Sequence, residues 1–328
     1  MLKSLYLLRM LLLHPLLISL ASLYLAYGIL QSGLVSIHII PSFFFTYLVF
    51  GISAYKLTFL AHEVAHNALL GSKRMNHLIG CLSCIFLFVP FEAYAFAHLR
   101  HHSARNVQSD PDSCNYCWDR TKEDRARLTK SDLLRLKLWL LEPLLFKRLH
   151  STARSLFSSQ AGLMHPMSGG SNRVFCVSVL LNTGLLYSFF YLIAFLVIGG
   201  LVQSLWIASA LLSTYFFASS SLSLFLGRCR TFCEHNTIAV CKTNSHGDMT
   251  KHIEIVTSLR GVNRPSDFMS NILFIDSNFN MHSYHHRYPG APSFYHPSFS
   301  QCRVSGQTTS RLTVMNEVWS ILKLDLES

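Results

Sequence analysis

Five long apolar stretches dominate this chain of 328 residues. Each approaches the roughly 20 residues that a helix needs to cross a bilayer, and they cover residues 10–30, 39–61, 78–96, 174–198 and 201–226. Half of all residues are hydrophobic and only 14% are charged, a low charged fraction for a soluble protein of this length. The first stretch exceeds the roughly 7–15 apolar residues of a signal peptide, so we expect it to be retained. The pattern predicts an all-α, multi-pass membrane protein.

The basic residues predict its orientation. The net charge of +11 would suit a nucleic-acid-binding protein if the basic residues were spread over a soluble surface. Instead, thirteen Lys and Arg lie in 99–173 and ten in 227–328, whereas the connections at 31–38 and 199–200 contain none. Cytoplasmic loops of membrane proteins carry such an excess, so we expect both termini and the long central segment on the cytoplasmic side and no nucleic-acid partner.

This orientation makes the third apolar stretch, 78–96, a segment that does not cross the membrane. Basic residues precede it and a histidine cluster follows it, and Pro90 and Glu92 are unfavourable in hydrocarbon. We therefore expect a single domain, 1–328, with four transmembrane helices in two hairpins (10–30 with 39–61, and 174–198 with 201–226). A re-entrant or interfacial helix at 78–96 and a cytoplasmic helical cap, 97–173 and 227–328, complete the predicted architecture. Within the cap, 133–141 and 310–324 have the pattern of amphipathic helices.

Nine of the seventeen histidines form four clusters, all on the predicted cytoplasmic side. Histidines three and four residues apart share one side of a helix, so each cluster is expected to converge. The clusters are His62 with His66; His98, His101 and His102; His235; and His282, His285 and His286.

Neutral imidazole is a good ligand for iron, copper, nickel and zinc, and nine imidazoles are too many for one ion. Two ions with four or five ligands each is the natural partition. Structural zinc sites prefer thiolate, whereas nitrogen-rich sites with an open position suit iron that binds oxygen. The nine cysteines form no disulfide pattern, and Cys114 and Cys117 lack a second pair that would complete a zinc site.

The chain resembles the membrane fatty acid desaturases and their hydroxylase relatives from about Ala61 to Pro297. The matching motifs are His62-Glu-Val-Ala-His66 with Asn76 and Gly80; His98-Leu-Arg-His-His102 with Asp110-Pro111-Asp112; Arg230-Thr-Phe-Cys-Glu-His235; and Asn280-Met-His-Ser-Tyr-His-His286 with Tyr288-Pro289. Two residues depart from the pattern: Tyr284 stands where many relatives carry Glu, and Arg287 where an apolar residue is more common.

The resemblance implies that the nine histidines bind two irons and that the centre uses O2 to remove two hydrogens from adjacent carbons of a lipid acyl chain. It does not identify catalytic residues beyond the metal ligands. The sequence contains neither a His-Pro-Gly-Gly haem motif nor paired rubredoxin cysteines, so a separate ferredoxin or small cytochrome is expected to supply electrons.

Three alternatives remain at the level of sequence. A hydroxylase or ketolase of the same superfamily would act on a carotenoid, sterol or alkane. A membrane zinc protease would use His62-Glu63-Val64-Ala65-His66, with Glu63 as general base, but that mechanism leaves seven clustered histidines without a role. A non-catalytic metal-binding membrane protein is disfavoured because ionisable clusters at a membrane are usually functional.

Several polar neighbours are candidates for supporting roles. Glu63 and Glu234 are expected to hold an imidazole N–H or to form salt bridges. Asp110 and Asp112 are expected to orient Arg or His residues or to cap a turn, and Asn278 and Asn280 are candidates for a polar or water-mediated contact to iron. The remaining histidines are expected to be packed or interfacial (His14, His38) or on the surface (His77, His150, His165, His246, His252, His296).

Overall fold

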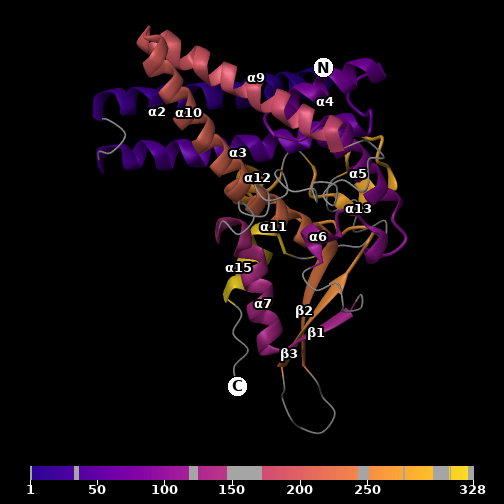
Figure 1. Ribbon diagram of the computed structural model, residues 1–328. Helices are drawn as coiled ribbons and strands as arrows, with labels where there is room; N and C mark the ends of the chain where they lie inside the picture. Colours follow the sequence, from indigo (N-terminus) through magenta and orange to yellow (C-terminus); the bar gives the residue numbers. More distant parts are fainter. Residues whose placement is uncertain are drawn as a thin grey trace. The chain divides into compact units, whose positions relative to one another are not determined.

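A computed structural model of the protein describes residues 2–32, 37–117, 125–145, 172–242, 251–275, 278–297, 310 and 312–323. These residues are mostly helical, and the chain divides into two compact units. One, which we call the span unit, consists of Met1–Phe96 and Pro143–Leu224; the other, the histidine unit, consists of Ala97–Glu142 and Phe225–Ser328. Figure 1 labels the elements of both units.

Four helices among the described residues are long and apolar enough to cross a membrane: Lys3–Gln31, Ile40–Ala65, Val177–Ile198 and Leu201–His235. They coincide with the four predicted spans. Their elements are α1 (Leu2–Leu8), η1 (Arg9–Leu13), α2 (His14–Ser32), η2 (Ile37–Ile39), α3 (Ile40–Ala65), α9 (Asn172–Ile198), α10 (Leu201–Ala218), η6 (Ser219–Ser223) and α11 (Leu224–His235). The prediction of a membrane protein is thereby supported, while the orientation stays a prediction.

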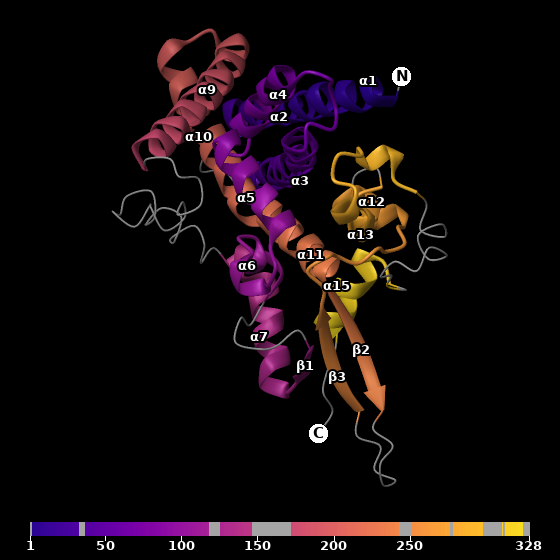
Figure 2. The ribbon, with the colours of Figure 1, turned by 90° about the vertical axis from the view of Figure 1, so that its right-hand side faces the viewer.

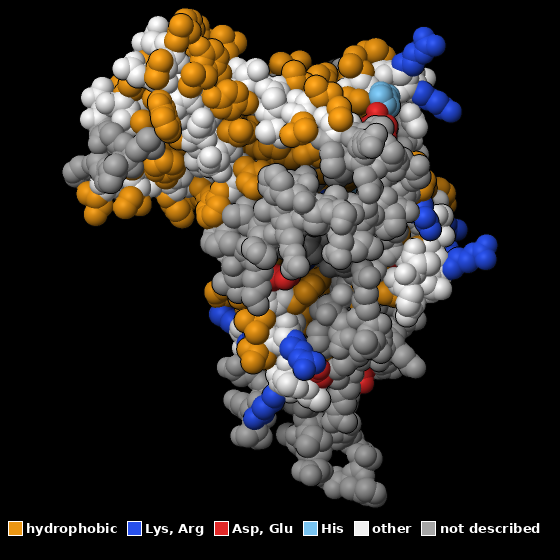
Figure 3. Space-filling model, in the orientation of Figure 1, with side chains coloured by type: hydrophobic (Ala, Val, Ile, Leu, Met, Phe, Trp, Pro, Cys, Tyr) orange, Lys and Arg blue, Asp and Glu red, His pale blue; other side chains and the backbone are white. Residues whose placement is uncertain are grey.

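Aromatic side chains form the core of the span unit. The ring of Phe50 in α3 lies 5.8 Å from Phe190 in α9 and 5.1 Å from Tyr215 in α10, and all three side chains are fully buried. The helices also present apolar side chains outward, as the orange surface in Figure 3 shows. Leu180, Leu196 and Trp206 are 70% exposed or more. An apolar exterior around an apolar core is what a helix bundle in lipid requires.

The third apolar stretch is two helices rather than one. α4 (Lys73–Ile85) ends in a turn at 86–90, where Phe88 has a positive φ of 54°, and α5 (Phe91–Ser103) follows. Neither is among the four candidate spans, which agrees with the prediction of a non-crossing segment. The Tyr215 hydroxyl donates to the Phe86 carbonyl, and the Asn182 amide donates to the carbonyls of Cys84 and Val89, so the turn is tied to α9 and α10.

The histidine unit combines short helices with a small sheet. Its elements, besides the greater part of α5 and of α11, are η3 (Val107–Ser109), α6 (Ser113–Tyr116), β1 (Arg125–Leu128), α7 (Lys130–Leu141), β2 (Asn236–Lys242), β3 (Lys251–Thr257), α12 (Phe268–Leu273), α13 (His282–Arg287), η7 (Ser293–Tyr295) and α15 (Val314–Lys323). A further turn, η4 (Glu142–Leu145), follows α7. The predicted amphipathic helices at 133–141 and 310–324 correspond to α7 and α15.

The sheet was not predicted, since the sequence analysis assigned the whole cap to helices. It is antiparallel, in the order β1-β3-β2, and Figure 2 shows β2 continuing from the end of α11. β2 and β3 read Asn236-Thr-Ile-Ala-Val-Cys-Lys and Lys251-His-Ile-Glu-Ile-Val-Thr, and both are rich in β-branched residues. That composition is typical of strands, and the sequence analysis did not use it.

Candidate metal centre

Three helices carry the seven clustered histidines that lie in the histidine unit. α5 bears His98, His101 and His102, α11 ends at His235, and the short helix α13 bears the remaining three: His282, His285 and His286. Pairing of Asn263 with Met281 and the bond from the Tyr284 amide to the Asn263 side chain hold the start of α13 in place. The cluster members are thus fixed to hydrogen-bonded backbone rather than to loose loops.

His101, His235, His282 and His286 form what we call the four-histidine cluster. One ring nitrogen of each lies within 4.8 Å of those of the other three. The Nε2 atoms are 3.2 Å apart between His101 and His286, 3.1 Å between His286 and His282, and 3.0 Å between His282 and His235. Two imidazole nitrogens bound to one metal at about 2.0–2.1 Å are about 3.0–3.4 Å apart, so the spacing fits a shared ion.

In His235 and His101, the hydrogen bond made by Nδ1 shows that Nε2 is the nitrogen available to a metal. Nδ1 of His235 lies 2.8 Å from the Ser258 carbonyl oxygen, which only accepts hydrogen bonds, so Nδ1 carries the proton. Nδ1 of His101 donates in the same way to the Asp110 carboxylate at 2.8 Å. In the neutral rings Nε2 is therefore a bare lone pair, and lone pairs 3.0–3.2 Å from another imidazole nitrogen are stabilised by a cation between them.

Asp110 connects His101 to a tyrosine. Its Oδ2 also accepts from the Tyr116 hydroxyl at 2.6 Å, while its Oδ1 accepts from the Asp112 backbone amide at 2.8 Å. Burial opposes the charge on both His101 and Asp110, but their mutual hydrogen bond outweighs it, raising the pKa of His101 and lowering that of Asp110. Asp110 thus both orients a histidine and caps a turn, which are the two roles expected of it.

Tyr116 was not singled out from the sequence. Its ring stacks on that of His235, with centroids 4.3 Å apart and planes at 25°. Burial, together with the hydrogen bond to Asp110, raises the pKa of Tyr116 well above its usual value, so it remains a neutral donor. The one signal in the sequence is its position just after Asp110-Pro111-Asp112, which is too weak to reveal a contact made by folding.

Glu234 lies next to His282, a member of the four-histidine cluster. Its Oε1 is 3.7 Å from Nδ1 of His282 and 3.3 Å from Nε of Arg230, and its side chain is nearly buried. Burial and the neighbouring histidines hold the pKa of His282 well below its ordinary value, which favours the neutral, ligating form. Both roles expected of Glu234, a salt bridge and a histidine contact, are therefore compatible with its position.

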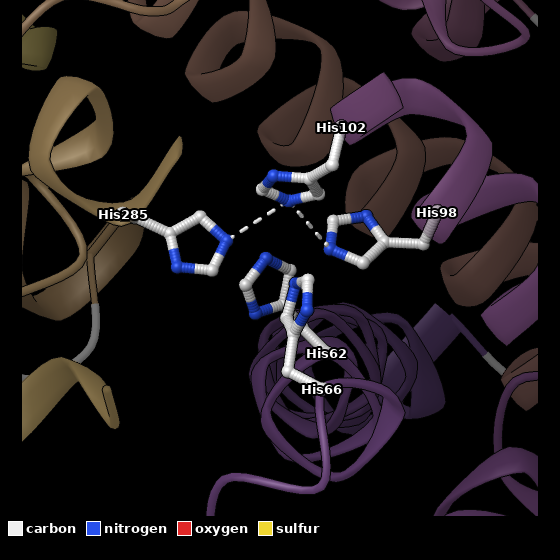
Figure 4. Close-up of side chains that lie close together, drawn as sticks. All are labelled: His62, His66, His98, His102 and His285. Carbon is white, nitrogen blue, oxygen red and sulfur yellow. Dashed lines mark hydrogen bonds between the residues drawn. The ribbon is translucent and has the colours of Figure 1, made fainter. Parts of the chain in front are cut away.

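His98, His102 and His285 form a second set, the three-histidine group. Nε2 of His102 lies 3.2 Å from Nε2 of His98 and 3.1 Å from Nε2 of His285, as the dashed lines in Figure 4 mark. These distances again match those of nitrogens that share one metal. The group is incomplete as a closed site, because iron or zinc is normally held by at least one further ligand.

The structure corrects the expectation that each cluster converges on one point. Successive residues of a helix are rotated by about 100°, so positions i and i+4 nearly coincide in direction, whereas i+3 and i+4 diverge. His98 and His102 accordingly belong to the three-histidine group, and His101 to the four-histidine cluster. In α13 the division is reversed: His282 and His286 join the cluster, and His285 joins the group.

His62 and His66 lie in the span unit, at the end of α3. Their rings are 5.1 Å apart at 68°, and Figure 4 shows both projecting from the same helix. His62 and Glu63 are buried, and His66 follows the last helical residue, Ala65. The predicted pairing of the two imidazoles on one helix face is thus observed.

Other candidates have structural contacts. The Asn280 amide donates to the Arg264 carbonyl and the Asn278 amide to the His296 carbonyl, so a contact of either with iron stays a prediction. His14 is packed, as expected. The surface prediction for His296 is wrong, because this residue is 4% exposed and its ring lies 5.9 Å from that of His285. His150, His165 and His246 lie outside the described residues, as do the side chains of His38, His252 and Cys114.

Arg264 is the largest fully buried side chain in the described part of the chain, and it too was overlooked. It donates to the carbonyls of Cys233 and Asn236, either side of the backbone turn that presents His235. It also bonds the Ser310 hydroxyl, the Leu312 carbonyl and the Glu317 carboxylate. A buried cation so completely paired fixes the segments it joins, here the end of α11 and the beginning of α15.

Comparison with known proteins adds one finding. The family model described as fatty acid desaturase matches residues 7–306, which is most of the chain. No curated protein and no solved structure matches the chain significantly. The matched range contains all nine clustered histidines and all four candidate spans except the first residues of the first span.

Proposed function

Because the chain belongs to the fatty acid desaturase family, we propose that it removes two hydrogens from adjacent carbons of a lipid acyl chain, using O2 and a pair of histidine-bound irons. The family makes the protein an oxidoreductase of lipid metabolism, and the four apolar helices indicate a membrane protein. The single observation that carries the iron proposal is the convergence of four imidazole nitrogens, 3.0–3.2 Å between neighbours, in the four-histidine cluster.

We assign one iron to that cluster, with His101, His235, His282 and His286 as ligands. The second iron would be held by His98, His102 and His285, completed by His62 and His66 from α3. Three arguments support this assignment. Three imidazoles alone leave the coordination of the ion incomplete, and α3 offers two further imidazoles on one helix face. Nine ligands also divide naturally into a set of four and a set of five.

When bound, the irons would supply the activation of O2. Per turnover, the substrate CH2–CH2 unit becomes CH=CH, O2 becomes two waters, and two electrons and two protons come from outside the substrate. We propose a separate ferredoxin or small cytochrome as the electron donor. Asp110 and the Ser258 carbonyl keep protons on Nδ1 of His101 and His235, which leaves Nε2 free to bind. The cytoplasmic position of the site remains part of the proposal.

The test is lipid analysis of a host that expresses the full chain, together with iron analysis of the purified protein. Wild type is expected to yield an additional double bond and to contain two irons. His101→Ala and His285→Ala are expected to abolish the product while the protein still inserts into the membrane; His165→Ala is the control and should retain activity. An oxygenated product would indicate the hydroxylase or ketolase alternative, and one zinc with peptide cleavage would indicate the protease. Full activity of His285→Ala would overturn the site assignment.

A further inference from the structure

A third group of metal-ligating side chains lies in the span unit, and none of them is among the nine clustered histidines. His77 and Cys81 are one turn apart on α4, and Glu92 is in the first turn of α5. Nε2 of His77 is 2.8 Å from Oε1 of Glu92, and Sγ of Cys81 is 3.7 Å from Nδ1 and 4.0 Å from Nε2 of His77. One ligand atom from each residue lies within 4.8 Å of the others. We call these residues the α4–α5 triad.

The packing of α4 against the start of α5 fixes this arrangement. A Cβ added to Gly80 would lie 2.4–2.5 Å from the ring of Phe91, so only glycine permits the observed contact. The edge of the same ring meets His77, with centroids 5.6 Å apart at 77°. Since Glu92 follows Phe91 directly, the contact that places the ring also places the carboxylate beside His77.

The beginning of α4 is anchored as well. Asn76 is buried, and its side chain accepts from the Leu70 amide and donates to the carbonyls of Leu70 and Ser72. The Ser72 hydroxyl caps the helix by accepting from the Met75 amide. The three ligands are therefore held by ordered helices, as a metal site requires.

The donor set identifies the class of metal. Imidazole nitrogen, thiolate sulfur and carboxylate oxygen are the three ligand types that zinc accepts, at about 2.0–2.3 Å. In a tetrahedral site such bonds put ligand atoms about 3.3–3.7 Å apart, which the triad reaches with small side-chain rotations. The thiolate and carboxylate charges would neutralise Zn2+. The side chains of His77 and Glu92 are 53% and 64% exposed, so water has access to a fourth position.

We propose that His77, Cys81 and Glu92 bind one zinc ion that joins α4 to α5. The site is distinct from the proposed iron ligands, and it fastens the beginning of the helix whose later turns carry His98, His101 and His102. The competing explanation is an ordinary ion pair between His77 and Glu92. That pair has no need of a thiol one helical turn away, which makes Cys81 the residue that separates the two explanations.

The experiment uses the full-length, iron-loaded protein in detergent, titrated with Co2+ as a probe for zinc. Wild type is expected to bind one cobalt per chain while retaining its iron, with thiolate-to-cobalt charge-transfer absorption in the near ultraviolet. Cys81→Ser should abolish that absorption. Glu92→Gln should weaken cobalt binding by at least about 10-fold to 100-fold, the effect of losing a group that merely supports a metal site. Zinc added in excess should displace the cobalt.

Cys84→Ala is the matched control, because Cys84 is on the same helix but buried at 1% exposure. It should keep both the absorption and the affinity. If the wild-type protein retained its iron but took up no cobalt, His77 and Glu92 would form only an ordinary ion pair, and the proposal would be overturned. Thiolate-to-cobalt absorption that survives Cys81→Ser would overturn it as well. Cobalt absorption does not depend on desaturation. The zinc proposal can therefore be tested even if the protein forms no double bond.

Discussion

The four-histidine cluster and the α4–α5 triad both bring metal ligands together, but they differ in what lies behind the ligands. In the cluster, His101, His235 and His282 are at most 4% exposed, and their Nδ1 atoms face Asp110, the Ser258 carbonyl and Glu234. In the triad, His77 and Glu92 are open to solvent and Cys81 is half-buried, and the three contact chiefly one another. Groups that fix the tautomer of a histidine belong to a site whose metal must be held in one geometry, whereas an exposed triad suits an ion that joins two helices.

The largest expected effect is the loss of a cluster ligand. His282→Ala removes a nitrogen that lies within 3.1 Å of two other ligand nitrogens, so the cluster should lose its iron and the product should fall below detection. Iron analysis and lipid profiling measure both. Cys81→Ser is the comparison: it should retain two irons. Equal iron loss in the two variants would mean that the cluster and the triad are not separate sites.

Removing Arg264 should have the next largest effect, because it breaks a buried ion pair with Glu317 and five hydrogen bonds of the guanidinium. Breaking a buried ion pair in this way costs about 3–5 kcal/mol, and Arg264→Leu should lower the free energy of unfolding by that order. Thermal unfolding in detergent checks this. The exposed Arg260→Leu is the matched control, expected to change little. If both variants were equally stable, Arg264 would not fix the end of α11.

A smaller effect on iron binding is expected when the substituted residue is a hydrogen-bond partner of a ligand rather than a ligand itself. Asp110→Asn replaces the carboxylate that accepts from Nδ1 of His101, and such changes typically weaken metal affinity about 10-fold to 100-fold. Competition with an iron chelator measures it, and Asp112→Asn should show a smaller change. The comparison with the triad is sharpened by Glu92→Gln, which should leave the iron affinity unaltered.

The smallest effect is expected from Tyr116→Phe. This change deletes the hydroxyl that donates to Asp110 but keeps the ring that stacks on His235. One hydrogen bond contributes about 0.5–1.5 kcal/mol net, so iron affinity should fall by less than Asp110→Asn lowers it. The same chelator competition decides this, and a loss larger than that of Asp110→Asn would assign Tyr116 a direct role at the metal.

The sequence determined the broad features of this protein. Four apolar spans and nine clustered histidines are local patterns, because hydropathy and helical spacing depend only on residues close together in the chain. The non-crossing third stretch stays a prediction. The amphipathic helices α7 and α15 followed the same logic, whereas the turn between α4 and α5 was not predicted. The sheet did not follow it: β1 pairs with β3 across more than a hundred positions, such as Arg125 with Val256, and the composition of the neighbouring strands β2 and β3 was not used.

Tertiary structure decided which histidine belongs to which set. His101 and His102 are neighbours in the chain, yet the rotation of about 100° between them sends one to the four-histidine cluster and the other to the three-histidine group. It also decided the supporting groups: the sequence signal of Tyr116 is weak, Ser258 and Arg264 carry none, and the burial of His296 was not predicted. Long-range contacts choose these partners because backbone carbonyls and single polar side chains are common everywhere in a sequence, and only packing selects the few that meet a ligand.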